Sequence, residues 1–358
     1  SRALVFLVAS CPCALVISIP LGYFSGIGVA SKAGVLFKGG SYLDAIARVN
    51  TVVFDKTGTL TEGQPTVTAW LWAQYQEEDF KRILLATEMN SPDPLAAAIT
   101  AALREERITP APLDGCGVLK GKGMKSLCNG TEYWVGSHKL LKDYRAYLSD
   151  VLGDMLVEYE SEGNSIVYFG REDELLAIIA VKDRLKATAS GVVKELRGQG
   201  LDICMLTGDG ERTASAIAGK LGIIRYMSDA QPEDKEAFIR ELRLQGKKVV
   251  MVGDGVNDAQ ALAAADVSIA AGASAGDGLA DKAMIVMKSA DLQSLPRLFG
   301  LSRHTLRLMR RNFFRTMAFH VAGVLVAAGI LYPVYGILLT PMLAVTVIAL
   351  SCIMPVKG

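Results

Sequence analysis

Four aspartates stand where predicted strands end and polar or glycine-rich segments begin. Asp55 follows the apolar run "TVVF", Asp209 follows "CMLTG", and Asp254 and Asp258 lie within "VMVGDGVNDA". In an open parallel sheet the carboxyl ends of the strands line one crevice, so we expect these carboxylates to lie together there. Each aspartate taken alone is better explained as a turn residue or a helix N-cap. The joint pattern favours a common site.

Carboxylates that converge in one crevice repel one another unless a cation neutralises them. Oxygen ligands beside phosphate chemistry suit Mg²⁺. Asp55 is then predicted to attack a phosphorus atom as a nucleophile and to form an aspartyl-phosphate. Lys235, in "AQPEDK", would supply positive charge opposite the phosphoryl oxygens, and Thr207 and Gly208, in "LTGD", would donate hydrogen bonds to them.

The elements that would position these residues follow an alternating pattern. From about residue 175 onwards, short apolar runs alternate with helix-like segments, which predicts an α/β fold with a doubly wound parallel sheet. The strand that carries Asp55 lies far upstream of the others. If it joins the same sheet, the residues between form an inserted α+β domain. The predicted boundaries are 49–61 and 172–300 for the parallel-sheet domain and 62–171 for the insertion.

The two ends of the chain are more apolar than its middle. The 358 residues allow roughly two or three domains. Lys and Arg (38) balance Asp and Glu (37), which argues against a nucleic-acid partner. Hydrophobic residues make up 51% of the chain and the mean hydropathy is +0.29, an excess that gathers at the ends. This pattern predicts a protein embedded in a lipid membrane.

Residues 1–48 are predicted to hold a transmembrane helix and a cytoplasmic extension, and residues 312–355 a transmembrane helix hairpin. The alternative for the hairpin is a pair of buried core helices. The basic run "RHTLRLMRRNFFR" before it fits a cytoplasmic flank. The sequence begins inside an apolar run without a start methionine, so we expect an N-terminal portion to be missing.

Two cysteines flank a proline within the first apolar run. Pro12 breaks the helical hydrogen-bond ladder and frees carbonyls, while Cys11 and Cys13 offer thiolates that favour Zn²⁺, Cd²⁺ or Cu⁺. Ligands of this kind are costly inside a membrane, which suggests a transport site, and two small buried thiols beside a kink are an equal alternative on spacing alone. His320 is a further candidate ligand or a cap for a neighbouring carbonyl. Cys352 is a third thiolate or a small packing residue.

The motifs together identify a family. "DKTGT", "TGDG" and "GDGVNDA" resemble the phosphorylation-domain signatures of P-type ATPases, which have a haloacid-dehalogenase-like core, and "CPC" resembles the heavy-metal-transporting branch. The resemblance covers nearly the whole chain. It implies ATP and Mg²⁺ as cofactors, phosphorylation of Asp55 by ATP, and the inserted domain as the nucleotide-binding domain. It also implies that the missing N-terminal portion contains an actuator domain and earlier membrane helices.

The family assigns further roles by position. Lys56 and Thr57 would flank the phosphorylated aspartate, with the Thr57 carbonyl touching Mg²⁺. Thr207, Gly208 and Asp209 would meet the phosphate and nucleotide, and Lys235 would neutralise the phosphate. Asp55 and Asp254 would bind Mg²⁺, and Asn257 and Asp258 would support the site.

The candidate nucleotide-binding residues lie in shorter and less specific motifs than those around Asp55. Gly115 and Gly117 in "GCGV", and Gly121 and Gly123 in "GKG", match the branch's glycine-rich nucleotide loops, although turns explain such glycines almost as well. Glu88 is a further candidate for the pocket, with helix solvation as the alternative. Where the branch usually has His before Pro, "SPDPLAAAI" has Asp93, a departure that weakens any adenine contact at this position.

The predicted function is therefore ATP-driven export of a soft or borderline metal ion across a membrane. Zn²⁺ or Cd²⁺ is favoured by "CPCALVISIP", and Cu⁺ or Ag⁺ is the alternative, since "GILYPVYGILLTPM" resembles copper pumps. A membrane-tethered phosphatase of the haloacid dehalogenase class, or a non-catalytic membrane binder, is less favoured. The phosphatase needs neither "CPC" nor the hairpin. We expect a multi-pass protein of the plasma membrane with its catalytic domains in the cytoplasm.

Overall fold

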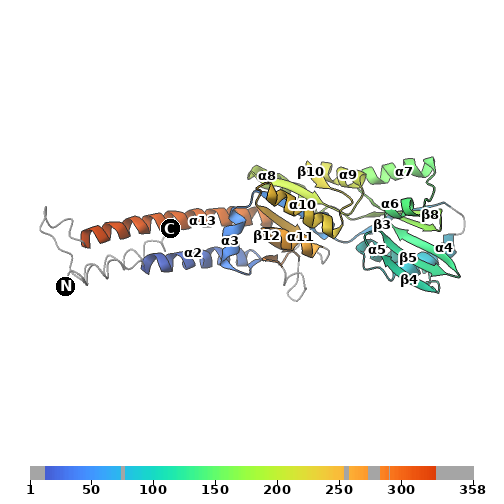
Figure 1. Ribbon diagram of the computed structural model, residues 1–358, viewed down its shortest axis with the longest axis horizontal. Helices are drawn as coiled ribbons and strands as arrows, with labels where there is room; N and C mark the ends of the chain where they lie inside the picture. Colours follow the sequence, from blue (N-terminus) through green and yellow to red (C-terminus); the bar gives the residue numbers. More distant parts are fainter. Residues whose placement is uncertain (1–12, 74–76, 254–257, 273–282, 290, 328–358) are drawn as a thin grey trace. The chain divides into compact units, whose positions relative to one another are not determined.

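The computed structural model describes residues 13–73, 77–253, 258–272, 283–289 and 291–327 (Figure 1). Contacts divide the chain into two compact units. The end unit contains residues 1–48, 284–288 and 294–358, and the central unit contains residues 49–283 and 289–293. Each unit is described separately below.

A parallel sheet in the central unit carries Asp55. Its strands lie in the order β12-β11-β2-β9-β10, and every neighbouring pair is parallel. The strands are β2 (Thr51–Asp55), β9 (Asp202–Leu206), β10 (Arg225–Met227), β11 (Val249–Gly253) and β12 (Val267–Ala271). The helices that alternate with them are α8 (Ala189–Gly198), α9 (Glu211–Leu221), α10 (Pro232–Leu244) and α11 (Ala259–Ala264). The predicted doubly wound parallel sheet is confirmed.

A second, antiparallel sheet is inserted between β2 and β9. Its order is β3-β8-β7-β6-β5-β4. The strands are β3 (Thr66–Trp72), β4 (Gly115–Leu119), β5 (Gly123–Cys128), β6 (Thr131–Gly136), β7 (Ser165–Arg171) and β8 (Glu174–Lys182). Residues of β7 alternate between two apolar clusters, with Phe169 on one face and Tyr168 on the other, as the two-residue period of a strand requires.

Helices cover both faces of the inserted sheet. α4 (Glu77–Glu88) and α5 (Pro94–Glu105) pack on the Phe169 side, and α6 (His138–Asp143) and α7 (Asp150–Ser161) pack on the Tyr168 side. α4 contacts β5 and β6, and α5 contacts β3 and β8, in the part of Figure 1 where these elements are labelled. Two covered faces give this sheet its own core, so the insertion is built as a domain.

One strand lies in a different sheet from the one predicted. The apolar run that begins at about residue 175 was predicted to join the parallel sheet, but it forms β8, which pairs antiparallel with β3 and β7. The inserted sheet therefore extends to Lys182, beyond the predicted boundary at residue 171. A continuous apolar run does not reveal which sheet it joins, because both kinds of sheet bury such strands when both faces are covered.

The two chain segments that connect the sheets are bonded to each other. The Thr61 hydroxyl donates to Asp183 Oδ2 at 2.6 Å, and Lys186 Nζ donates to the Gly58 and Thr59 carbonyls at 2.8 Å each. Thr61 and Leu185 also form an isolated antiparallel bridge. The outgoing and returning segments thus form one connection, which holds the inserted sheet next to the turn that follows Asp55.

The end unit contains two longer helices. They are α2 (Cys13–Lys32) and α13 (Ser294–Ala327), with α3 (Gly40–Ala47) and the antiparallel pair β1 (Val35–Phe37) and β13 (Ile285–Met287). Gly22 and Gly26 of α2 face Met309 and Thr305 of α13, so these glycines allow close packing of the two helices. Within the described residues, no helix is long and apolar enough to cross a membrane. The predicted second run of the hairpin, 337–354, lies outside them.

Candidate active site

Asp55 ends the central strand of the parallel sheet. β2 is flanked by β11 and β9, and all five of its residues are buried. The chain then turns away through Lys56–Leu60, where Gly58 has a φ of +68°, a conformation that glycine adopts without steric cost. The Asp55 carboxylate therefore lies at the carboxyl edge of the sheet, where ligands bind in open α/β folds.

One lysine joins two of the predicted carboxylates. Lys235 Nζ, from the first turn of α10, lies 2.5 Å from Asp55 Oδ1 and 2.8 Å from Asp258 Oδ1. Gly253, which ends β11, makes room for this arrangement, because a Cβ there would lie 2.8 Å from Asp258 Oδ2. Residues from three separate elements thus form the buried triad Asp55–Lys235–Asp258.

A second buried ion pair lies beside the first. Lys56 Nζ is paired with Asp209 Oδ2, which also accepts a hydrogen bond from the Thr207 hydroxyl at 2.8 Å. Asp209 Oδ1 accepts a hydrogen bond from the Ser165 hydroxyl at 2.6 Å. Ser165 was not predicted, since it begins β7 of the inserted sheet and no sequence motif marks it.

The triad holds two carboxylates and one ammonium group, and this balance affects the pKa values of its members. Burial, and then the charge of Asp258, raise the pKa of Asp55 to about 6, although Lys235 and Lys56 act in the opposite direction. Burial would lower the pKa of Lys235, but Asp55 and Asp258 raise it, so the ammonium stays charged. Two buried carboxylates that share one lysine fit a further cation at this edge.

The residues predicted to form the magnesium site lie only partly within the described part of the chain. Asp254 and Asn257 lie outside the described residues, as Figure 1 indicates for 254–257. In the part of the chain that the structure describes, no group of three or more His, Cys, Asp or Glu could hold a metal ion. Asp55 and its neighbour Asp258 supply carboxylate oxygens of the kind that Mg²⁺ prefers, so the residues present fit this ion.

The remaining predicted residues of this site lie in the same two loops. Thr57 follows Lys56 in the turn after β2, and Gly208 lies between Thr207 and Asp209 after β9. Burial alone would raise the pKa of Asp209, but Lys56, Ser165 and Thr207 outweigh it and lower the pKa. Asp209 is therefore ionised at neutral pH and forms an ion pair with Lys56 beside Asp55.

A second site with a buried acid lies in the inserted domain. Glu88 ends α4, and burial, followed by the charge of Asp93, raises its pKa to about 8. No hydrogen bond or ion pair joins its carboxyl group to another of the described side chains. Asp93 caps α5, since its Oδ1 accepts from the Leu95 amide at 2.8 Å. The position where the heavy-metal branch usually has a histidine is therefore occupied here by the N-cap residue of α5.

The four predicted glycines divide into two pairs. Around Gly115 and Gly117, in β4, a Cβ would meet nothing within 4 Å, so the packing of the protein does not explain the lack of a side chain. A Cβ at Gly121 would meet Gln231 at 2.7 Å, and one at Gly123 would meet the Val135 carbonyl at 2.0 Å. Internal packing therefore accounts for the second pair, and only the first pair borders open space.

Comparison with known proteins decides the family. A sequence profile of the haloacid dehalogenase-like hydrolases matches residues 49–266. The chain belongs to this family. The match begins before the Asp55 strand and ends after β11, so it covers the inserted sheet, the parallel sheet except β12, and the residues of the candidate site from Asp55 to Asp258.

The relatives of this haloacid dehalogenase-like chain are heavy-metal P-type ATPases, as the motifs predicted. It is 35% identical to a copper-exporting P-type ATPase of Legionella pneumophila, over 97% of this chain and 47% of the relative. It is 39% identical to a probable cadmium-transporting ATPase of Alkalihalophilus pseudofirmus, over 90% of this chain and 46% of the relative. The chain therefore spans less than half the length of these relatives.

A solved structure gives a further match. The crystal structure of a zinc-transporting PIB-type ATPase in its E2.Pi state superposes with a TM-score of 0.66 at 33% identity. The match covers 96% of this chain and 55% of the other. The names of the three proteins give three different ions: copper, cadmium and zinc. The likeness therefore supports a heavy-metal P-type ATPase and does not select one of these ions.

The predicted ligands for a transported ion are mostly outside the described part of this haloacid dehalogenase-like chain. Cys11 and Cys352 lie outside it, and Cys13 is the first residue of α2. His320 lies on α13 and is half-buried. These four residues remain predictions.

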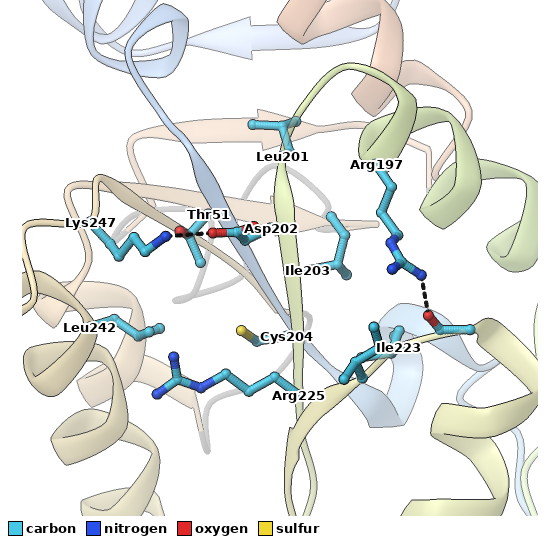
Figure 2. A pocket seen from close by; sticks show the side chains of 12 residues that line it. Thr51, Arg197, Leu201, Asp202, Ile203, Cys204, Ile223, Arg225, Leu242 and Lys247 are labelled. Atoms are coloured by element: carbon cyan, nitrogen blue, oxygen red, sulfur yellow. Dashed lines mark hydrogen bonds and ion pairs between the residues drawn. The ribbon is translucent and has the colours of Figure 1, made fainter.

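A cavity of about 220 Å³ in the haloacid dehalogenase-like domain lies far from the predicted chemistry (Figure 2). Thr51 and Asp202, which line it, begin β2 and β9, so the cavity lies at the opposite end of these strands from Asp55. Its charged groups are engaged within the protein: Lys247 pairs with Asp202 at 2.6 Å, and Arg197 donates to the Gly222 carbonyl at 2.5 Å. No predicted site residue lines it.

Proposed function

We propose that the chain is the catalytic and C-terminal part of a P-type ATPase that exports a heavy-metal ion across a membrane through an aspartyl-phosphate. The arrangement of Asp55, Lys235 and Asp258 carries this proposal. A buried carboxylate at the end of a parallel strand, with one lysine 2.5 Å away and another in the adjacent position of the chain, is suited to accept a phosphoryl group.

In the proposed reaction a carboxylate oxygen of Asp55 attacks the γ-phosphorus of ATP. The bond between this phosphorus and the bridging oxygen breaks, and ADP leaves with the electron pair. Lys235 offsets the charge of the phosphoryl oxygens, Gly208 donates a hydrogen bond to them, and the Thr207 hydroxyl would turn from Asp209 to donate a second. Mg²⁺ held by Asp55, Asp254 and the Thr57 carbonyl would supply charge neutralisation for the phosphoryl group.

The inserted domain is proposed to bind ATP. Gly115 and Gly117 border open space, which lets a nucleotide approach the backbone closely. Glu88 lies close to this strand, since the thiol of Cys116, between the two glycines, contacts the carbonyl of the preceding residue Thr87 at 4.0 Å. At neutral pH the carboxyl group of Glu88 is protonated and offers the nucleotide a hydrogen-bond donor as well as an acceptor.

Zn²⁺ or Cd²⁺ is the favoured ion, with Cys11, Cys13, His320 and Cys352 as its proposed ligands. Export of Cu⁺ or Ag⁺ is the second candidate, which the copper-exporting relative supports. In both cases the protein spans a membrane several times, and its catalytic domains lie in the cytoplasm. An N-terminal portion with an actuator domain would complete the pump and hydrolyse the phosphoenzyme.

The test is a metal panel with γ-labelled ATP. The intact pump should hydrolyse ATP faster with one or two of Zn²⁺, Cd²⁺, Co²⁺, Cu⁺ and Ag⁺, and should form an acid-stable phosphoenzyme. The double variant Cys11→Ala/Cys13→Ala should lose the metal stimulation and still bind nucleotide. A protein that forms no acid-stable phosphoenzyme would contradict the proposal. A rate of ATP hydrolysis that is the same with each ion and without added metal would also contradict it.

A further inference from the structure

Ser165 connects the inserted domain to the ion pair beside Asp55. It is the first residue of β7 and is buried. Its hydroxyl donates to Asp209 Oδ1 at 2.6 Å and accepts from Lys56 Nζ at 3.4 Å. One hydroxyl of the nucleotide-binding sheet therefore contacts both members of a buried ion pair in the phosphorylation domain.

The segment that carries Ser165 is held in place from the other domain. The carbonyl of Asn164 accepts from the Thr213 hydroxyl at 2.7 Å, and the carbonyl of Glu162 accepts from Lys220 Nζ at 2.6 Å. Thr213 and Lys220 belong to α9, which follows the loop that contains Asp209. The position of the Ser165 hydroxyl relative to Asp209 is therefore fixed by two independent contacts of its own segment.

The contacts of Asp209 are divided between its two oxygens. Lys56 and Thr207 contact Oδ2, whereas Ser165 donates to Oδ1. The terminal torsion of an aspartate has a broad energy profile, so a carboxylate bonded through one oxygen alone can rotate. The bond from Ser165 prevents this rotation, and the carboxylate in turn fixes the ammonium group of Lys56, the residue that follows Asp55.

We propose that Ser165 is a positioning residue for phosphoryl transfer. Its hydroxyl orients the Asp209 carboxylate and, through it, the ammonium group of Lys56 next to the nucleophile Asp55. This inference rests on the proposed function. It also gives the nucleotide-binding sheet a direct effect on the phosphorylation site, because movement of β7 would displace a hydrogen bond of the catalytic ion pair.

The experiment measures phosphoenzyme formation in the full chain by rapid quench, with γ-labelled ATP and Mg²⁺, and nucleotide affinity separately by equilibrium binding. Ser165→Ala should slow phosphorylation at saturating ATP about 10-fold, the loss expected for one hydrogen bond to a charged group. The dissociation constant for ATP should stay within about twofold, because Ser165 acts through Asp209. Ser165→Thr, which keeps the hydroxyl, should restore the rate.

Two further variants separate positioning from packing. Ser165→Cys has nearly the same volume but only a weak donor, so it should be as slow as Ser165→Ala. Ser228→Ala is the matched control: it also removes a serine–carboxylate hydrogen bond of 2.6 Å, to Glu211 Oε2, and should keep the wild-type rate. A wild-type rate for Ser165→Cys would overturn the inference, even if Ser165→Ala folds poorly.

A double variant tests the route of the effect. If Ser165 acts through Asp209, then Ser165→Ala/Asp209→Asn should phosphorylate no more slowly than Asp209→Asn alone. Fully additive losses would contradict the inference. A wild-type chain that forms no phosphoenzyme would refute the proposed function itself, whereas normal labelling of both wild type and Ser165→Ala would refute only the role of Ser165.

Discussion

The two domains of the central unit each bury a carboxyl group, but only one of them surrounds it with cations. Asp55 lies 2.5 Å from Lys235 and next to Lys56, and its pKa is raised only to about 6. Glu88 is buried beside another acid, Asp93, and its pKa is raised to about 8. At neutral pH the first group is mostly an anion and the second is mostly a neutral acid.

This difference indicates what each site is built to do. A carboxylate must be ionised to attack phosphorus, and the lysines around Asp55 reduce the free-energy cost of burying that charge. Glu88 has no such compensation, so it keeps its proton and can act only by hydrogen bonding. Burial is common to both groups, and the neighbouring charges decide between a nucleophile and a hydrogen-bond donor.

The largest effect is expected for Asp55→Asn, which removes the proposed nucleophile. The carboxamide is not a nucleophile, so acid-stable labelling from γ-labelled ATP should be lost completely while nucleotide still binds. The matched control is Asp202→Asn, which changes an exposed aspartate of the same sheet that pairs with Lys247 and should label normally. Labelling that survives in Asp55→Asn would remove its assignment as the nucleophile.

Removal of the shared lysine should have the next largest effect. Lys235→Met leaves Asp55 and Asp258 buried without their cation, which should lower the free energy of unfolding by about 3–5 kcal/mol and raise the pKa of Asp55 further. Chemical denaturation measures the loss. Lys247→Met, which breaks an exposed pair, should cost less than about 1 kcal/mol. Adding Asp258→Asn to Lys235→Met should recover part of the stability but not the phosphorylation.

Glu88→Gln tests the protonation of Glu88 through the pH dependence of the free energy of unfolding. The pKa of Glu88 is about 8 in the folded protein against the ordinary glutamate value of 4.5, so the folded state binds more protons between these values. The free energy of unfolding should therefore fall as pH rises from 4.5 towards 8, by on the order of a few kcal/mol. In Glu88→Gln this part of the pH dependence should vanish.

Thermal melting at pH 5 and at pH 9 measures that dependence. Glu78→Gln, at an exposed position of the same helix, is the control and should keep the wild-type pH dependence. If Glu88→Gln and the wild type lose stability equally between the two pH values, Glu88 is not a neutral acid in the folded protein.

The smallest expected change in stability concerns Gly117. Gly117→Ala places a methyl group in open space, so the melting temperature should hardly change while ATP affinity falls severalfold. Gly123→Ala would place its Cβ 2.0 Å from the Val135 carbonyl and should destabilise the domain. Equilibrium nucleotide binding and thermal melting separate the two effects. Unchanged affinity in Gly117→Ala would argue against a nucleotide beside this strand.

Local patterns predicted the parallel sheet well and the inserted sheet less well. Strands that alternate with helices have few alternative arrangements, so β9, β11 and β12 could be anticipated together with the insertion after Asp55, whereas the three-residue strand β10 was not predicted. β8 was assigned to the wrong sheet, because its buried apolar run has the same appearance in either one. The glycines at 121 and 123 match a nucleotide loop in sequence, but packing already explains them.

The sequence by itself determined the chemistry, because the residue types that can accept, neutralise and bind a phosphoryl group occur in a fixed order from Asp55 to Asp258. Only the tertiary structure decided how those groups are charged and held. It brought Ser165 to Asp209 across 44 positions of the chain and buried Glu88 close to the acid Asp93. Protonation and orientation depend on neighbours in space, and folding chooses those neighbours from distant parts of the chain.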